Sequence, residues 1–330
     1  MGEILAVAAV VGPERTAPAC VDVPATPLRG APRARAVYVC DDGPQGQESG
    51  DPVNRIGPGR GRVTTVHVAV AQFAPGEDKD ENLAGARALV AEAAERGAGV
   101  VVLPEYTMFT VPRTDHRLID AAEPLTGAFV SGVRGLAREH GVHVVAGVNE
   151  ASEEDKRVHN TLLAVDPSGE IVATYRKLHL YDAFGFTESA VIRPGEISAP
   201  ETFTVDSVTL GMQTCYDLRF PEVTRRIVDA GADVLLLPAA WVPGPLKEDH
   251  WRTLVRARAI ENTMYVAAAG QHAPTGAGSS MVVDPMGVTV AALGEQTGVA
   301  VGEISTERIG DVRSRNPALR LRRFRVVPSE

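Results

Sequence analysis

The chain has 330 residues, of which 44% are hydrophobic and 23% are charged, and this composition is ordinary for a globular enzyme. The net charge is −9, and no long basic run precedes a short basic tail at residues 320–325, so we expect no nucleic-acid partner. The longest uncharged apolar run, residues 4–11, is too short to cross a bilayer, so we expect no membrane partner either.

Residues 1–62 differ in composition from the rest of the chain. They hold 8 of the 23 prolines and 9 of the 32 glycines, a fraction typical of low-complexity segments. Their charges follow neither a helical nor a strand period, so we expect a disordered extension outside the active domain. Because GTG can encode Val63 and can serve as a bacterial start codon, native translation from that residue is the competing interpretation. We expect residues 63–330 to form one domain.

Strands and helices alternate after this extension. Residues 66–73 predict a strand, residues 83–96 a helix with one apolar face, and residues 100–103 a strand that is covered on both faces. The same order recurs in a helix at 129–139 and a strand at 142–148.

The second half of the chain mixes hairpins with a further alternating series. Asp-Pro-x-Gly sequences at 166–169 and 284–287 predict type I turns of two hairpins. Between them the patterns predict strands at 208–214, 234–237 and 265–269, and helices at 222–230 and 251–262. We therefore expect an α/β fold in which the sheets are mixed parallel and antiparallel, with helices on their outer faces.

The cysteines and glycines exclude several kinds of cofactor site. Cys20, Cys40 and Cys215 are widely spaced, with no CxxC pair and no histidine cluster, so we expect neither a zinc site nor a disulfide framework. No glycine-rich loop follows a strand in the context that phosphate binding requires. We expect no metal and no cofactor, and a reducing cytoplasm as the location.

Three segments place a reactive side chain just after an apolar strand, where loops present functional groups. They contain Glu105, Lys177 and Cys215. Taken singly, each residue has an ordinary explanation: a turn cap for Glu105, an exposed charge on an edge strand for Lys177, and a small buried hydrophobe for Cys215.

Taken together, the segments resemble the nitrilase superfamily of carbon–nitrogen hydrolases. The most specific strings are Cys-Tyr-Asp-Leu-Arg-Phe-Pro-Glu at 215–222 and the segment 250–262, which contains His-Trp and Arg-Ala-Arg-Ala-Ile-Glu-Asn. The resemblance runs from about residue 66 to residue 324. It implies a four-layer α-β-β-α sandwich with two mixed sheets, assembly into homodimers or higher homo-oligomers, and a catalytic triad of Glu105, Lys177 and Cys215.

These three residue types suit amide hydrolysis through a thioester. Cysteine is a good nucleophile, but a thiol with a pKa near about 8.5 needs a base at neutral pH. Glu105 fits the general base, because one carboxylate can take the thiol proton and return it to the leaving amine. Lys177 fits a donor to the oxyanion, together with the backbone N–H of Tyr216.

Other residues are candidates for supporting roles. Glu188 matches a position where the family often has an additional glutamate that holds the lysine; a surface loop charge is the alternative. Arg219 has two open interpretations: bidentate binding of a substrate carboxylate, or an ion pair with Glu222 or Asp217 that stabilises the fold. Tyr106 and Trp241 are further candidates for substrate contacts.

The string after the cysteine points to a branch of the family. Nitrilases commonly have Cys-Trp-Glu, whereas this chain has Cys-Tyr-Asp, as do ω-amidases and deaminated-glutathione amidases. These enzymes act on 2-oxo-acid amides, so we expect a small amide that bears a carboxylate as the substrate. The sequences at 241–249 and 183–186 differ from those usual in that branch. Aliphatic amides and N-carbamoyl amines are therefore alternative substrates, and nitriles are a less favoured one.

Two rivals have different functions. One is a non-catalytic relative that uses the fold for binding, which the intact triad disfavours. The other is a glutamine-hydrolysing subunit that feeds ammonia to a ligase, which would need a separate nucleotide-binding chain.

Overall fold

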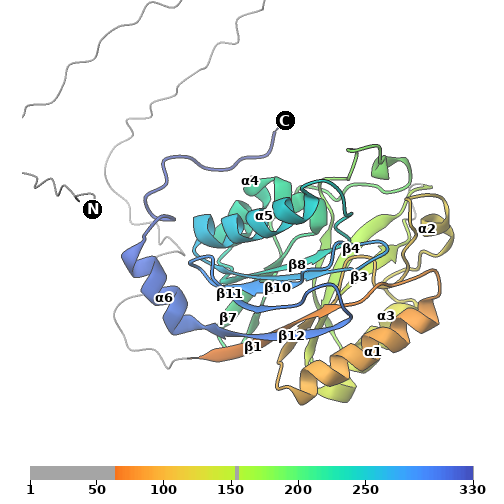
Figure 1. Ribbon diagram of the computed structural model, residues 1–330, viewed down its shortest axis with the longest axis horizontal. Helices are drawn as coiled ribbons and strands as arrows, with labels where there is room; N and C mark the ends of the chain where they lie inside the picture. Colours follow the sequence, from red (N-terminus) through yellow and green to blue (C-terminus); the bar gives the residue numbers. More distant parts are fainter. Residues whose placement is uncertain (1–63, 153–155, 330) are drawn as a thin grey trace, which may run out of the picture. The chain divides into compact units, whose positions relative to one another are not determined.

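The computed structural model describes residues 64–152 and 156–329, so our predictions for residues 1–62 lie outside the described residues. These described residues form two six-stranded sheets with helices on their outer faces (Figure 1).

The first sheet has the strand order β12-β1-β2-β3-β4-β5. Strands β1, β2 and β3 are parallel, whereas β4, β5 and β12 pair antiparallel with their neighbours. The bounds are β1 Thr65–Gln72, β2 Val100–Val102, β3 His143–Glu150, β4 His159–Val165, β5 Ile171–Arg176 and β12 Gly298–Ser305.

The second sheet has the order β11-β10-β9-β8-β7-β6. Its three middle strands β7, β8 and β9 are parallel, and the outer strands pair antiparallel. The bounds are β6 Thr202–Val205, β7 Val208–Met212, β8 Val234–Ala239, β9 Tyr265–Gly270, β10 Met281–Val283 and β11 Thr289–Ala292.

Three apolar cores separate four layers. One lies between the first sheet and helices α1 and α3, one between the sheets, and one between the second sheet and helices α4 and α5. Figure 1 shows the two helix pairs on opposite sides of the sheets. The helices are α1 Lys79–Glu95, α2 Arg117–Asp120, α3 Ala128–His140, α4 Pro221–Asp229, α5 Lys247–Asn262 and α6 Thr306–Arg315, with 3₁₀ helices η2 Glu188–Ala190 and η3 Cys215–Arg219. The four-layer α-β-β-α prediction is therefore confirmed.

Strand β1 shows how one segment fills two cores. Successive side chains of a strand point to opposite faces. Val68 and Val70 join the core between the sheets, whereas Ala69 and Ala71 join the core beneath α1 and α3. The small alanines leave room for α1, which contributes Ala86 to that same core. Such a strand is apolar throughout because both of its faces are covered.

The two predicted hairpin turns are present. Gly169 donates its backbone N–H to the carbonyl of Asp166, and Gly287 donates to that of Asp284, each at 2.8 Å. Both glycines have positive φ values, of 83° and 79°, which a side chain would strain. The turns join β4 to β5 and β10 to β11, so the sequence patterns locate both hairpins.

Two helices begin four residues before their predicted starts. The side chain of Asp78 caps α1 by accepting two backbone N–H groups of its first turn, which the apolar pattern does not reveal. Helix α5 begins at Lys247, directly after Leu246, whose φ of 60° turns the chain into the helix. None of the helices in the described part of the chain has both the length and the apolar character needed to cross a membrane.

Some elements have patterns too short or too weak to predict. α2 and β6 have only four residues each. β12 contains Gly298 and Gly302, and glycine weakens a strand pattern. Gly302 is required by packing, because a Cβ there would lie 2.8 Å from the Val282 side chain of the other sheet.

Candidate active site

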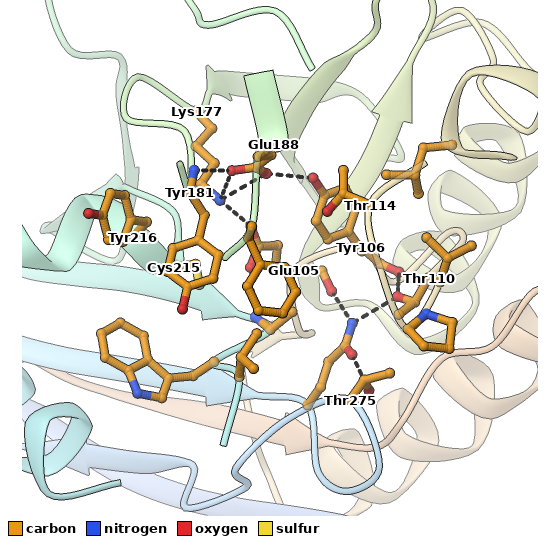
Figure 2. A pocket seen from close by; sticks show the side chains of 18 of the residues that line it. Glu105, Tyr106, Thr110, Thr114, Lys177, Tyr181, Glu188, Cys215, Tyr216 and Thr275 are labelled. Atoms are coloured by element: carbon orange, nitrogen blue, oxygen red, sulfur yellow. Dashed lines mark hydrogen bonds and ion pairs between the residues drawn. The ribbon is translucent and has the colours of Figure 1, made fainter. Parts of the chain in front are cut away.

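A cavity opens where the ends of several strands meet, and its lining combines reactive groups with aromatic rings (Figure 2). The lining includes Glu105, Lys177, Glu188 and Cys215 together with Tyr106, Tyr181, Tyr216 and Trp241. The centre of a water-sized sphere can occupy a volume of about 80 Å³ in this cavity. Since one water needs roughly 10–15 Å³ by this measure, the space suits a small ligand. Within the described residues, no group of three or more His, Cys, Asp or Glu side chains is arranged to hold a metal ion.

Glu105 follows β2 and is only 1% exposed. Its Oε1 accepts hydrogen bonds from Nζ of Lys177 at 2.9 Å and from Nδ2 of Asn160 at 2.7 Å. Its Oε2 accepts the backbone N–H of Ala240, just after β8, at 2.6 Å. The carboxylate is thus held by donors from both sheets, which fixes its orientation in the cavity.

A glycine on the neighbouring strand lets the Glu105 loop approach closely. A Cβ at Gly147 of β3 would lie 2.6 Å from the backbone nitrogen of Tyr106 and 3.0 Å from the Cα of Glu105. The carbonyl of Gly147 also accepts the N–H of Met108 at 3.1 Å. Only glycine therefore allows this loop to pack against β3.

Lys177 lies just after β5, with its side chain buried between two carboxylates. Its Nζ is 2.9 Å from Glu105 and 2.9 and 3.0 Å from the two oxygens of Glu188. Burial alone would lower the pKa of Lys177, but the charges of Glu105 and Glu188 raise this pKa well above its ordinary value. The ammonium therefore stays charged, and the alternative of an exposed edge-strand lysine is wrong.

Glu188, the first residue of η2, is buried rather than on the surface, so the surface-charge alternative is also wrong. Besides Lys177, it accepts the hydroxyl of Tyr106 at 2.7 Å and the backbone N–H of Tyr181 at 2.6 Å. Burial and the Glu188 charge raise the pKa of Tyr106 well above its usual range, so this phenol stays protonated. Figure 2 shows the resulting chain from Tyr106 through Glu188 to Lys177.

Cys215 lines the cavity at the start of η3, and it is a free thiol. Burial raises the pKa of this thiol well above its ordinary value, Glu105 raises it further, and Lys177 lowers it. The resting thiol is therefore protonated at neutral pH. It needs a base at the moment of attack, and the nearby carboxylate of Glu105 can serve as one.

A buried aspartate anchors the turn that carries the thiol. Asp217 accepts the backbone N–H of His179 at 2.9 Å and the hydroxyl of Tyr175 at 2.7 Å. Its Oδ1 also lies 2.8 Å from Nδ1 of His179. Since these partners flank Lys177, the segment of the lysine and the segment of the cysteine are tied together.

The remaining predicted residues lie toward the outer part of the site. Trp241 is buried, donates its indole N–H to the carbonyl of Lys247 at 2.7 Å, and presents its ring to Arg219, whose Cζ is 4.8 Å from the ring centroid. Within the described residues, Nε and Nη2 of Arg219 have no hydrogen-bond partner. Arg219 therefore does not form the predicted alternative ion pair with Asp217 or Glu222.

Sequence reasoning misses three polar residues of the site. Asn160 donates to Glu105, and Gln271 donates to the backbone carbonyl of Glu105 at 2.8 Å. The signal for Asn160 is a polar run at 159–161 that leads into the apolar run of the same strand. Lys247 lines the cavity, and it lies one helical turn before Trp251 on the buried face of α5. A lysine in register with an apolar stripe is the signal for it.

Comparisons with known sequences point to one family. The family model described as carbon-nitrogen hydrolase matches residues 67–314. A deaminated glutathione amidase from Escherichia coli O157:H7 is 40% identical over 260 residues, which cover 78% of this chain and 97% of that protein.

Solved structures share the fold. The NitFhit protein of C. elegans has a TM-score of 0.72 at 32% identity, and the match covers 78% of this chain and 65% of that one. A mutant amidase from Nesterenkonia sp. AN1 has a TM-score of 0.65 at 27% identity, over 78% of this chain and 94% of that one. In that structure the acetamide moiety of fluoroacetamide is added covalently at the active-site cysteine.

Proposed function

The chain belongs to the carbon–nitrogen hydrolase family, and from this premise we propose that it is a cysteine-dependent amidase that acts on a small amide bearing a carboxylate. One observation carries the proposal: Glu105, Lys177 and Cys215 line one small cavity, in which Lys177 is paired with Glu105 at 2.9 Å. The covalent adduct in the Nesterenkonia amidase supports a cysteine nucleophile.

In the first half of the reaction, Sγ of Cys215 attacks the carbonyl carbon of the amide while Glu105 takes the thiol proton. The tetrahedral intermediate then breaks its C–N bond, and Glu105 delivers that proton to the leaving ammonia or amine. A thioester between Cys215 and the acyl group remains. Because the thiol pKa is raised, proton removal is coupled to attack, and no free thiolate has to accumulate.

The negative charge that develops on the carbonyl oxygen needs fixed donors. Lys177 supplies a permanent positive charge, and the backbone N–H of Tyr216 supplies a second donor, since the first N–H groups of a helix have no partner within it. Donors of this kind typically contribute a factor of roughly 10²–10³ each to turnover.

In the second half, Glu105 takes a proton from water, which attacks the thioester carbon. The C–S bond breaks, the acid is released, and Glu105 returns the proton to the thiol. Glu188 does not touch the reacting atoms in this scheme; it positions Lys177 and Tyr106 by accepting hydrogen bonds from Nζ of Lys177 and from the hydroxyl of Tyr106. One carboxylate thus serves as acid and base in turn.

The relatives and Arg219 support a proposal for the substrate class. The deaminated glutathione amidase of Escherichia coli is 40% identical, so we propose a 2-oxo-acid amide or a close analogue. Arg219 lines the cavity, and its guanidinium can bind the carboxylate of such a substrate.

A substrate screen tests this proposal. Release of ammonia or amine is measured with deaminated glutathione, 2-oxoglutaramate, glutamine, aliphatic amides, N-carbamoyl amino acids and matching nitriles. We expect the carboxylate-bearing amides to be hydrolysed fastest, in the presence of a chelator and without ATP. Faster hydrolysis of a nitrile than of its amide, or no hydrolysis of any amide, would contradict the proposal.

We also propose that the enzyme acts in the cytoplasm as a homodimer or higher homo-oligomer, without nucleic-acid or membrane partners. Support for assembly comes from exposed apolar side chains on α5 and on the β10–β11 hairpin, among them Ile260, Met286 and Val288. Light scattering on the purified chain measures the oligomeric state, and a monomer at micromolar concentration would contradict it.

A further inference from the structure

Lys247 enters the cavity from the first turn of α5, and nothing in the scheme above uses it. Its residue exposure is only 7%. Its Nζ is hydrogen-bonded to the hydroxyl of Tyr181 and lies 4.7 Å from that ring centroid and 4.6 Å from the ring centroid of Phe184. Among the described residues, no carboxylate forms an ion pair with this ammonium. A cation held among aromatic rings without a counter-charge is costly unless an anion completes the site.

A second cation without a carboxylate lies nearby. The Cζ of Arg219 is 5.8 Å from the ring centroid of Phe184, the ring that Lys247 also contacts. Burial lowers the pKa of Lys247 and the positive charge of Arg219 also lowers it, whereas Cys215 and Glu248 raise it. The two positive groups therefore repel each other, and a bound anion offsets that repulsion.

Charge is divided unevenly along the cavity. At the catalytic end, Lys177 is paired with Glu105 and Glu188. At the other end, Arg219 and Lys247 are positive and unpaired within the described residues. An amide that enters with its reacting carbonyl toward Cys215 therefore places other parts of its chain near two cations that no carboxylate of the described residues neutralises.

The two cations differ in the geometry of their hydrogen-bond donors, so each is suited to a different acidic group. The Arg219 guanidinium is a planar group whose paired N–H donors can take both oxygens of a single carboxylate. Lys247 is a point charge with further N–H donors beyond its bond to Tyr181. It is the first residue of α5 and lies within the segment 241–249, which departs from the family's usual sequence.

Resting on the proposed amidase function, we propose that Lys247 is a specificity-determining residue that binds a second acidic group of the substrate, distinct from the carboxylate held by Arg219. The preferred substrates are then amides with two carboxylates, one on the acyl side and one on the amine side of the scissile bond.

Four matched amides test this proposal: N-glutarylglycine with both carboxylates, N-propylglutaramate with the acyl-side one, N-butyrylglycine with the amine-side one, and N-propylbutyramide with none. We compare the wild type with Lys247→Met, which keeps the apolar stem, with Arg219→Met, and with Lys247→Arg, which keeps the charge. Lys156→Met, at an exposed lysine, controls for the loss of one positive charge.

We expect Lys247→Met to raise the KM for N-glutarylglycine by about 10–100-fold, the value of a charge-assisted hydrogen bond, with little change in kcat. Lys247→Met should also raise the KM for one of the two monocarboxylates, and Arg219→Met should raise the KM for the other. Lys247→Arg should restore most of the loss, and Lys156→Met should change nothing. Equal effects of Lys247→Met on all four amides, or effects of both variants on the same carboxylate, would overturn the assignment.

Binding separates this assignment from the proposed function. Calorimetry measures the Kd of N-glutarylglycine for Cys215→Ala enzyme with and without Lys247→Met. If the amides are not hydrolysed but binding still depends on Lys247, the amidase proposal fails and the subsite stands. If they are hydrolysed but neither Kd nor KM depends on Lys247, the subsite fails and the amidase stands.

Discussion

Cys215 has a left-handed backbone conformation, with φ of 42°, and so does Tyr106, with φ of 54°. Such values are uncommon for residues other than glycine and are found mostly where surrounding contacts enforce them. Here the enforcing contacts are the anchor of η3 by Asp217 and the packing of the Glu105 loop on β3. The strain is thus stored at the two segments that bring the proposed nucleophile and base together.

For Cys215→Ala we expect turnover to fall by about 10⁴-fold or more, because no other side chain can form the acyl intermediate. Folding should be retained, since one small side chain replaces another, and circular dichroism with thermal unfolding measures this. Iodoacetamide, itself a small amide, should label Cys215 in the wild type in preference to Cys20 and Cys40, as peptide mass spectrometry can show. Appreciable activity in the folded alanine variant would rule out the covalent route.

The pH dependence of alkylation tests the electrostatics of the thiol. Glu105 raises the pKa of Cys215 and Lys177 lowers it. The Glu105→Gln variant should therefore be alkylated with a midpoint at lower pH than the wild type, and Lys177→Met with a midpoint at higher pH. Both variants should lose turnover, by roughly 10²–10⁴-fold for the base. Midpoints that move in the opposite directions, measured by iodoacetamide kinetics from pH 6 to 10, would contradict this account.

Sequence alone predicts the reactive residues better than their surroundings. Glu105, Lys177 and Cys215 each lie in a recognisable string, and the structure brings all three to one cavity. Their supports are not recognisable in this way, because Asn160 and Gln271 reach Glu105 only through pairing and packing of distant strands. The partner of Arg219 likewise depends on distances in the folded chain, and the spacing of residues along the sequence does not determine these distances.

At the scale of elements, the site depends on how closely a loop can pack against its neighbouring strand. For Gly147→Ala we expect kcat to fall by roughly 10-fold or more, because the new Cβ displaces the Tyr106 backbone and moves Glu105 from its donors. The melting temperature should also fall, since the loop and β3 must separate. Gly135→Ala on α3, where a Cβ meets nothing within 4 Å, is the matched control. Unchanged kcat in a folded Gly147→Ala enzyme would show that this close approach is not needed.

The elements themselves divide into those with strong and those with weak patterns. Buried parallel strands such as β2 and β8 are continuous apolar runs, and the turns at Gly169 and Gly287 have their own signature, so the patterns predict them. Helix starts are weaker signals, because a side-chain cap or a turn residue sets them locally. For α5 this matters for function, since its true start brings Lys247 into the cavity.

At the scale of the whole molecule, our prediction for residues 1–62 remains open to test. Thr64, just after this segment, is already joined to α6, since its N–H donates to Oγ1 of Thr306 at 3.1 Å. We expect a shortened chain that begins at residue 63 to keep both its melting temperature and its kcat/KM within error of the full chain. Loss of stability or activity on shortening would mean that the segment packs on the enzyme. N-terminal sequencing of the native protein then distinguishes an extension from a misassigned start.

The pairing of β1 with β12 has a consequence for biosynthesis. Residues Thr65–Gln72 are made first among the described strands, but their antiparallel partners Gly298–Ser305 are made last among them. At about 5–20 residues per second, the wait is roughly 10–50 s. During that time one edge of β1 is unpaired, and an unpaired edge invites contact with other chains. Slower translation lengthens this exposure, so we expect the yield of folded enzyme to fall when β12 is made more slowly.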